Sequence, residues 1–282
     1  MSEAGDTRAL AILCGGGGLP LEVARAAAAN GRPPFLVGLV GATDPAIEAF
    51  SHIWVRLGEV GKLFAALAER RVADLAIVGA LTRPEFSELR LDWGALKRAP
   101  RLAALFRGGD NRLLAGVAAI FEREGVRVVG AHEIAPQMLA PLGPIGVRAA
   151  APDADADARL GAEALAALSP FDVGQGVVVA DGRVVAVEAA EGTDAMLERV
   201  AALRASRWLR FSGPAGVFVK APKRGQDLRL DMPAIGPRTI ALAARAELKG
   251  VALAAGLVLI AERGETARRA DQAGLFVAGF PP

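Results

Sequence analysis

The sequence has few of the residues that build disulfides, zinc sites or membrane spans. Among 282 residues there is one cysteine, Cys14, and there are two histidines, His52 and His132. One cysteine cannot form an intramolecular disulfide, and neither histidine has a nearby Cys or His with which to bind zinc. The longest apolar stretch, 251–261, is too short to cross a bilayer, and acidic residues stand where an export signal carries basic ones. These absences predict a cytoplasmic protein.

The charge balance excludes a duplex-binding protein. Lys and Arg number 33, Asp and Glu number 31, and the net charge is +2, whereas nucleic-acid-binding proteins concentrate a large basic excess on one face. Five of the basic residues are lysines, so arginine is the default cation and the close pair Lys220 and Lys223 stands out. A hydrophobic content of 52% excludes disorder, and the length favours two domains of about 140 residues each.

The first half of the chain alternates short apolar runs with helical patterns. The spacing predicts strands over 9–14, 35–40, 75–78 and 126–129, and helices over 21–30, 61–71 and 111–124. Short apolar strands separated by helices indicate a parallel sheet covered on both faces. We therefore expect a Rossmann-like N-terminal domain over residues 1–150.

The second half follows a different pattern, after a small, acidic stretch at 149–158 that marks a domain boundary. Asp181-Gly182 lies between two β-branched runs and predicts a hairpin. A helix is expected over 193–203, capped by Thr193 or Asp194. Further strands and helices predict an α+β or mixed-sheet C-terminal domain over 151–282. The fold class is thus α/β with two domains.

Two loops precede predicted helices and are candidates for phosphate binding. Gly15–Gly18 lies between a strand and a helix, where backbone N–H groups can approach a phosphate. A nicotinamide site is disfavoured, because Pro20 replaces the third glycine of the fingerprint and no acid closes the second strand. A tight turn without a ligand stays open, as does a phosphate contact. Asp110 is either a helix N-cap or a ligand contact.

Two charged segments in the second half contain the most closely spaced side chains that could bind a ligand or take part in catalysis. EAAEGTD over 188–194 places three carboxylates around a glycine and a threonine; it indicates either a bound cation or a capped helix. In KAPKRGQDLRLDMPAIGPRT over 220–239, Asp227 and Asp231 share one face in a strand and in a helix alike. Lysines bind phosphate oxygens and paired aspartates hold a divalent ion or activate water. A salt-bridged, solvated strand is the alternative.

Four motifs together carry a resemblance to a known family. They are CGGGGLP over 14–20, SPFDVGQ over 169–175, VEAAEGTDAM over 187–196 and the 220–239 segment. In this order they resemble the UDP-2,3-diacylglucosamine pyrophosphatases of lipid A biosynthesis, in the branch with a Rossmann-like N-terminal domain. The calcineurin-like phosphoesterase branch needs more histidine ligands than two. Arg224 stands where this family is expected to have proline.

The resemblance implies hydrolysis of UDP-2,3-diacylglucosamine to UMP and the sugar lipid 1-phosphate called lipid X. It also implies a divalent ion, Mg²⁺ or Mn²⁺, and attack of water on the phosphorus nearer the sugar. Asp227 matches the family's essential carboxylate, within QDLR. The expected site residues are Asp227, Lys220, Lys223 and Gln226 for catalysis, Gly16, Gly17, Gly18, Gln175, Thr193, Asp110 and Arg229 for substrate, and Asp227, Asp231 and Glu191 for metal.

A non-catalytic regulator that binds a nucleotide sugar or a lipid is the alternative function. It would use the glycine loop and the lysines, but not the aspartates. If the resemblance holds, the substrate lies in a bilayer, so we expect a cytoplasmic protein in transient, peripheral contact with the inner membrane. We also expect a homodimer.

Overall fold

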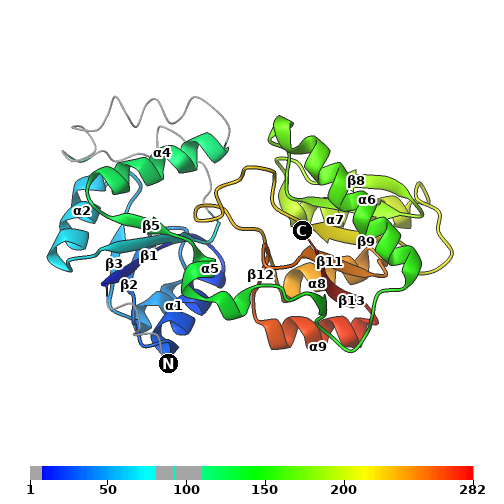
Figure 1. Cartoon of the computed structure of the whole chain (residues 1–282), viewed down its shortest axis with the longest axis horizontal. Coiled ribbons are helices and arrows are strands. Elements are labelled where there is room, and N and C mark those ends of the chain that lie inside the picture. Colours follow the sequence, from blue (N-terminus) through cyan, green and yellow to red (C-terminus); the bar gives the residue numbers. More distant parts are fainter. Residues whose placement is uncertain (1–7, 81–91, 93–109, 282) are drawn as a thin grey trace. The chain divides into compact units, whose positions relative to one another are not determined.

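The computed structural model describes residues 8–80, 92 and 110–281. Its internal contacts divide the chain into two compact units. Unit 1 holds the described residues up to 136 together with 227–231, and unit 2 holds 137–226 and 232 onward. Figure 1 shows helices and a sheet in each unit. The predicted two-domain α/β architecture is confirmed.

Unit 1 is built on a parallel sheet, as predicted. Its strands follow the order β3-β2-β1-β4-β5, and every neighbouring pair is parallel. The elements are β1 (Leu10–Cys14), α1 (Leu19–Ala29), β2 (Phe35–Leu39), the short 3₁₀ helix η1 (Pro45–Ala49), β3 (His52–Val55), α2 (Val60–Glu69), β4 (Asp74–Val78), α4 (Asp110–Arg123), β5 (Arg127–Val129) and α5 (Ala131–Ile134), followed by η3 (Pro136–Met138). The edge strand β3 was not predicted; its apolar run is only three residues long, and three of its four residues are partly buried.

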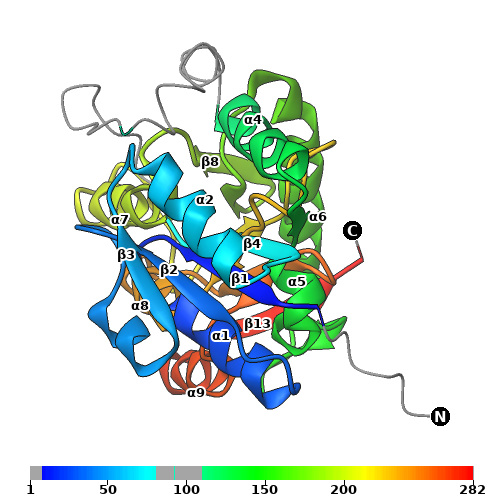
Figure 2. The ribbon, with the colours of Figure 1, turned by 90° about the vertical axis from the view of Figure 1, so that its left-hand side faces the viewer.

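Helices cover both faces of this sheet (Figure 2). On one face, Leu67 of α2 and Phe121 of α4 pack against Ala11, Val37 and Leu75 of the strands. Helices α1 and α5 lie on the opposite face and contact each other and the sheet. The strand order reverses between β1 and β4, and in such sheets ligands bind at the carboxyl ends of the strands beside this point.

Unit 2 contains a mixed sheet of order β6-β13-β11-β9-β7-β8 and a small parallel pair, β10-β12. Strands β9, β11 and β13 run parallel, while β7 is antiparallel to β8 and β9, and β6 to β13. The elements are β6 (Gly143–Pro144), α6 (Pro152–Leu168), η4 (Ser169–Phe171), β7 (Gly176–Ala180), β8 (Arg183–Val187), α7 (Gly192–Ala205), β9 (Val217–Lys220), β10 (Ala234–Ile235), α8 (Pro237–Arg245), β11 (Gly250–Ala254), β12 (Leu259–Ile260), α9 (Arg263–Ala273) and β13 (Phe276–Phe280). The mixed sheet confirms the prediction for the C-terminal domain.

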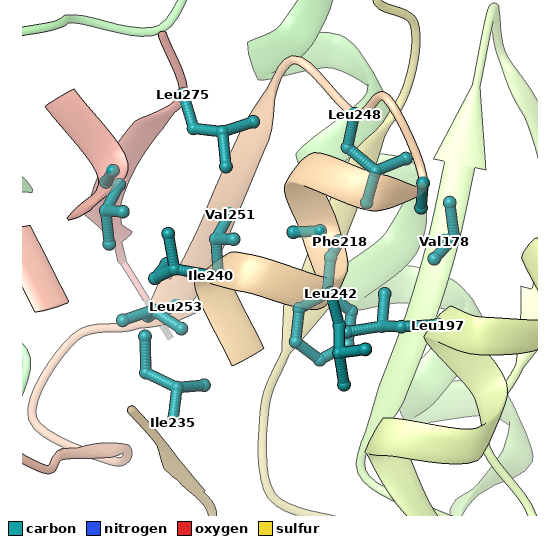
Figure 3. Close-up of a cluster of buried hydrophobic side chains, with 14 of the residues drawn as sticks. Val178, Leu197, Phe218, Ile235, Ile240, Leu242, Leu248, Val251, Leu253 and Leu275 are labelled. Atoms are coloured by element: carbon teal, nitrogen blue, oxygen red, sulfur yellow. The ribbon is translucent and has the colours of Figure 1, made fainter. Parts of the chain in front are cut away.

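The core of unit 2 lies on both faces of the mixed sheet. Figure 3 shows Leu197 of α7 beside Phe218 of β9, and Ile240 of α8 beside Val251 and Leu253 of β11, on the face that α7, α8 and α9 cover. On the other face α6 packs closely, because a Cβ on its Gly161 would lie 2.5 Å from the Val219 side chain. Phe218 is fully buried, and truncating such a residue to alanine costs about 3–5 kcal/mol.

The predicted hairpin is confirmed at Asp181-Gly182, which joins β7 to β8 with φ angles of 51° and 71°. The acidic stretch at 149–158 lies within unit 2, where α6 begins at Pro152. Its Asp157 is buried because the carboxylate accepts the N–H groups of Asp181 and Gly182 at 3.2 and 2.8 Å. These two hydrogen bonds hold the hairpin against α6.

No helix in the described part of the chain is long and apolar enough to cross a membrane.

Candidate active site

The glycine loop follows β1 and is held against the end of β4. The N–H of Gly16 donates to the carbonyl of Ala80 at 2.8 Å. A Cβ on Gly15 would lie 2.5 Å from the same oxygen, so only glycine fits there. Gly17 has a φ of +88°, Gly18 is the N-cap of α1, and both border open space. A tight turn thus explains Gly15, while a phosphate contact stays a prediction for Gly16, Gly17 and Gly18.

Cys14 is a packing residue at the end of β1. Burial raises the pKa of its thiol to about 12, so the thiol is protonated at neutral pH and is not a nucleophile. The hydroxyl of buried Thr43 donates to the carbonyl of Cys14 and accepts the N–H of Leu39 at 2.8 Å. This hydroxyl ties the carboxyl ends of β1 and β2 together.

In unit 2, Lys220 ends β9 inside the protein. Its side chain is 5% exposed, and its ammonium donates to the carboxylate of Glu188 at 2.9 Å and to the hydroxyl of Thr193 at 2.6 Å. Two glycines make room for Glu188, because a Cβ on Gly174 or Gly176 would lie within 2.5 Å of that side chain. Glu188 is one of the three carboxylates of EAAEGTD but was not among the predicted site residues. Here it is the partner of a buried cation.

The predicted cap of α7 is wrong. The N-cap is Glu191, without a side-chain capping bond, and Asp194 pairs with Arg238 at 2.6 Å. The Thr193 oxygen instead accepts from Lys220. Since an ammonium group only donates, the hydroxyl hydrogen of Thr193 does not take part in that bond. The bond from Lys220 fixes the orientation of the hydroxyl, whose hydrogen can donate to another acceptor.

Glu191, predicted as a metal ligand, is also in unit 2. Its carboxylate accepts the N–H of Ala189 at 3.2 Å and pairs with Arg199 at 2.7 Å. Hydrogen bonds from the backbone and from Arg199 lower its pKa. It is therefore ionised at neutral pH and already has a cationic partner.

The loop that follows Lys220 is closed by side chains. The N–H of Lys223 donates to the side-chain oxygen of Gln226 at 2.9 Å, and the ammonium of Lys223 pairs with Asp172 at 2.5 Å. The N–H of Arg224 donates to the Ser169 hydroxyl at 3.0 Å. Proline has no N–H, so this bond requires a residue such as arginine where the family resemblance predicted proline.

These contacts bring three of the four predicted motifs together in unit 2. Asp172 and Ser169 belong to SPFDVGQ, and the carbonyl of Gln175 accepts the N–H of Ala221 at 3.0 Å. Glu188 and Thr193 belong to VEAAEGTDAM, and Lys220 links that motif to the loop. The fourth motif, the glycine loop, is in unit 1.

The chain then returns to unit 1 as a turn over 227–231. The N–H of Asp231 donates to the carbonyl of Asp227 at 3.2 Å, and the segment is a single turn, neither the extended strand nor the helix of the two alternatives. The Asp227 carboxylate accepts the backbone N–H of Arg229 at 3.0 Å and its guanidinium at 2.7 Å. Hydrogen bonds from Arg229 outweigh partial burial and lower the pKa of Asp227. Asp227 is therefore ionised at neutral pH.

Arg229, predicted to bind substrate, anchors this turn to the edge of the sheet of unit 1. Its guanidinium also donates to Glu122 of α4 at 3.1 Å and to the carbonyl of Val128 in β5 at 3.4 Å. Leu230 is buried in the core that α2 and α4 cover. Polar and apolar contacts together fix the position of Asp227 relative to β5.

His132, which no sequence pattern singled out, lies beside the same turn. Its Nδ1 is buried and is without a hydrogen-bond partner among the described residues. The ring packs on Gly130, where a Cβ would lie 2.3 Å from the ring and 3.2 Å from the Cα of Arg229. Charge on His132 contributes to the lowered pKa of Asp227. A lone histidine in a sequence carries no pattern that would have revealed this.

The expected metal ligands do not form a complete set within either unit. Asp227 and Asp231 belong to unit 1 and Glu191 to unit 2. Among residues 8–80, 92 and 110–281, no three His, Cys, Asp or Glu side chains gather as metal ligands. Asp110 begins α4, and its side chain lies outside the described part.

The mixed-sheet unit holds lysines and an oriented hydroxyl, and the Rossmann-like unit holds an ionised aspartate. Such groups are typical of enzymes that act on phosphorylated substrates. The comparisons with known proteins agree. The family profile of the LpxI N-terminal domain matches residues 9–138, and that of the LpxI C-terminal domain matches residues 141–278. The chain belongs to the LpxI family.

A relative from Caulobacter vibrioides is 41% identical over 275 residues, which cover 98% of each chain. That protein is named UDP-2,3-diacylglucosamine pyrophosphatase LpxI.

Proposed function

We propose that this protein hydrolyses the diphosphate of UDP-2,3-diacylglucosamine to UMP and lipid X, in lipid A biosynthesis. The observation that carries the proposal is the 41% identity to a pyrophosphatase of that name over 98% of both chains. It supports the two-domain branch of these enzymes and not the calcineurin-like one. The regulator alternative is weaker because it gives Asp227 no role.

The chemistry requires a water aligned with one phosphorus and donors for the charge that develops on the phosphate oxygens. In unit 1, Asp227 is ionised and held in one orientation by Arg229. A carboxylate with a lowered pKa is a weak base, so its proposed role is to orient the attacking water by accepting its hydrogen bond. Arg229 is then a positioning residue.

In unit 2, donors for the diphosphate surround the closed loop. The proposed donors are Lys223, the hydroxyl of Thr193 and the amide of Gln175. Lys220 is buried against Glu188, so we assign it to directing Thr193, and Gln226 to closing the loop around Lys223. Gly16, Gly17, Gly18 and Asp110 remain proposed substrate contacts in unit 1.

Dependence on Mg²⁺ or Mn²⁺ is part of the proposal, with Asp227, Asp231 and Glu191 as the proposed ligands. When bound, such an ion would supply positive charge to the phosphate oxygens. We also propose a homodimer in the cytoplasm, in salt-sensitive contact with the inner membrane, where a doubly acylated substrate lies. Light scattering tests the dimer. Fractionation of a lysate at low and at about 0.5 M salt tests the membrane contact, since salt screens surface charge.

The activity is tested by incubating purified protein with UDP-2,3-diacylglucosamine and Mg²⁺ and measuring UMP. The proposal predicts turnover that the Asp227→Asn variant loses. A regulator would bind the substrate and release no UMP in either form. Binding without turnover by the wild-type protein would overturn the enzymatic proposal.

A further inference from the structure

The turn that follows α7 presents a tryptophan to solvent. Trp208 is 82% exposed, the highest value among the large aromatic residues that the structure describes. Arg207 and Arg210 beside it are exposed as well. Tryptophan buries more apolar area than most residues, so one left in solvent calls for an explanation by function.

The backbone of this turn is held in place, so the exposure of Trp208 is built into the fold. Arg207 adopts the left-handed conformation with a φ of 61°, and its N–H donates to the carbonyl of Arg204 at 2.9 Å. The N–H of Leu209 donates to the carbonyl of Leu203 at 3.1 Å, and Leu209 packs against the core of unit 2. With Leu209 directed inward, its neighbour Trp208 is directed outward.

A second set of contacts fixes the far side of the turn. The guanidinium of Arg204 donates to the carbonyl of Gly213 at 2.7 Å and pairs with Glu247 at 2.7 Å. It also lies 5.4 Å from the centre of the Phe211 ring. Arg204 is thereby neutralised and serves the structure of the turn.

The stretch of sequence that contains Trp208 carries charge of one sign. From Arg199 to Gln226 the chain has seven Lys and Arg residues and no Asp or Glu. Among the residues that the structure describes, Arg210 donates only to the backbone carbonyl of Arg207, at 3.1 Å. Neither Arg207 nor Arg210 has an ion-pair partner within the described part of the chain. Two uncompensated cations thus flank one exposed indole ring.

We propose that the segment Arg207–Phe211 docks this protein on an anionic lipid bilayer surface. Tryptophan favours the interface of a bilayer, where its ring lies among the headgroups and its N–H finds a partner. Each arginine near an anionic surface adds electrostatic attraction to the bilayer. One ring and two cations give a weak, reversible contact, which suits an enzyme that must leave the bilayer with its product. Only this last argument rests on the proposed function.

Vesicle binding without substrate tests the docking by itself. Full-length protein is sedimented with vesicles of phosphatidylglycerol and phosphatidylcholine, and with phosphatidylcholine alone, at low and at about 0.5 M salt. We expect binding to the anionic vesicles only, lost at high salt. Trp208→Ser and Arg207→Gln/Arg210→Gln should each reduce partitioning about tenfold or more. Arg159→Gln/Arg183→Gln removes the same charge from other exposed sites of unit 2 and should retain most of the binding.

Two results would overturn the proposal. One is equal partitioning of the Trp208 variant and the wild type, with folding of both checked by thermal unfolding. The other is a loss of self-association in the Trp208 variant without loss of vesicle binding, which would make the turn a protein–protein contact.

Activity assays separate this proposal from the proposed function. The Trp208→Ser variant should match the wild type on substrate in detergent micelles and be several-fold slower on substrate embedded in anionic vesicles. If the wild type is inactive in micelles but binds vesicles through Trp208, the proposed function fails and the docking stands. If the variant is equally active on both substrates, the docking fails and the function stands.

Discussion

Arg229 holds Asp227 by two kinds of hydrogen bond at once. Its backbone N–H reaches one carboxylate oxygen at 3.0 Å, and its guanidinium reaches the other at 2.7 Å. The same guanidinium is tied to β5 and α4 through Val128 and Glu122. Asp227 is thus the ionised end of a chain of contacts that begins in the sheet of unit 1.

Replacing Asp227 by asparagine should lower kcat by about 10² or more, because its charge is proposed to act mainly in the transition state. Stability should change little, since the side chain is partly exposed. Steady-state kinetics and thermal unfolding are the two measurements. A folded variant with near-normal turnover would show that Asp227 has another role.

Replacing Arg229 by glutamine should change the pH dependence as well as the rate. The hydrogen bonds of Arg229 keep the pKa of Asp227 below 3.8, so Asp227 remains ionised as the pH falls to that value. Without them its pKa rises, and the acid limb of the kcat/KM profile should move to higher pH. Arg268→Gln, which breaks an exposed pair with Glu265, is the matched control and should leave the limb in place. An unshifted limb in the Arg229 variant would contradict this account.

Replacing Glu188 by glutamine should destabilise the protein by about 3–5 kcal/mol, because Lys220 would remain buried without a counter-charge. Glu265→Gln, on the surface, should cost much less, because water screens the pairs of Glu265 with Arg268 and Arg269. Urea unfolding compares the two. If Lys220→Met is added, part of the loss should return. Equal effects of the two glutamate variants would show that the buried pair is dispensable.

Chelation by EDTA should abolish turnover, and Mg²⁺ or Mn²⁺ should restore it, since a diphosphate needs its charge neutralised. The circular dichroism spectrum should not change, because the described residues form no cluster through which a metal would staple the fold. Full activity in the chelator would remove the ion from the mechanism.

Local patterns predicted most of the fold. Asp181-Gly182 specified its hairpin because both positive φ angles come from those two residues, and strands β1, β2, β4 and β5 were predicted from their apolar runs. Strand β3 was not predicted, and three of its four residues are only partly buried. The α7 cap was wrong because a residue 27 positions away, Lys220, takes the Thr193 hydroxyl.

The candidate site was predicted less completely, because it depends on contacts between distant residues. Asp227 and the lysines were recognisable by motif. That the 227–231 turn belongs to unit 1 follows from the burial of Leu230 and the reach of Arg229, neither of which has a signature in sequence. The contacts of Glu188 and His132 form only when β9 and α5 have folded, so the sequence alone did not reveal them.

Hydrolysis in H₂¹⁸O tests the central claim most directly, because the label reports both the bond cleaved and the phosphorus attacked. With UDP-2,3-diacylglucosamine as substrate, the account predicts one ¹⁸O in the phosphate of lipid X, none in UMP, and no labelled product from the Asp227→Asn variant. Mass spectrometry of the two products gives the answer. Label in UMP would contradict the proposed point of attack, and the absence of both products from the wild-type protein would contradict the proposed activity itself.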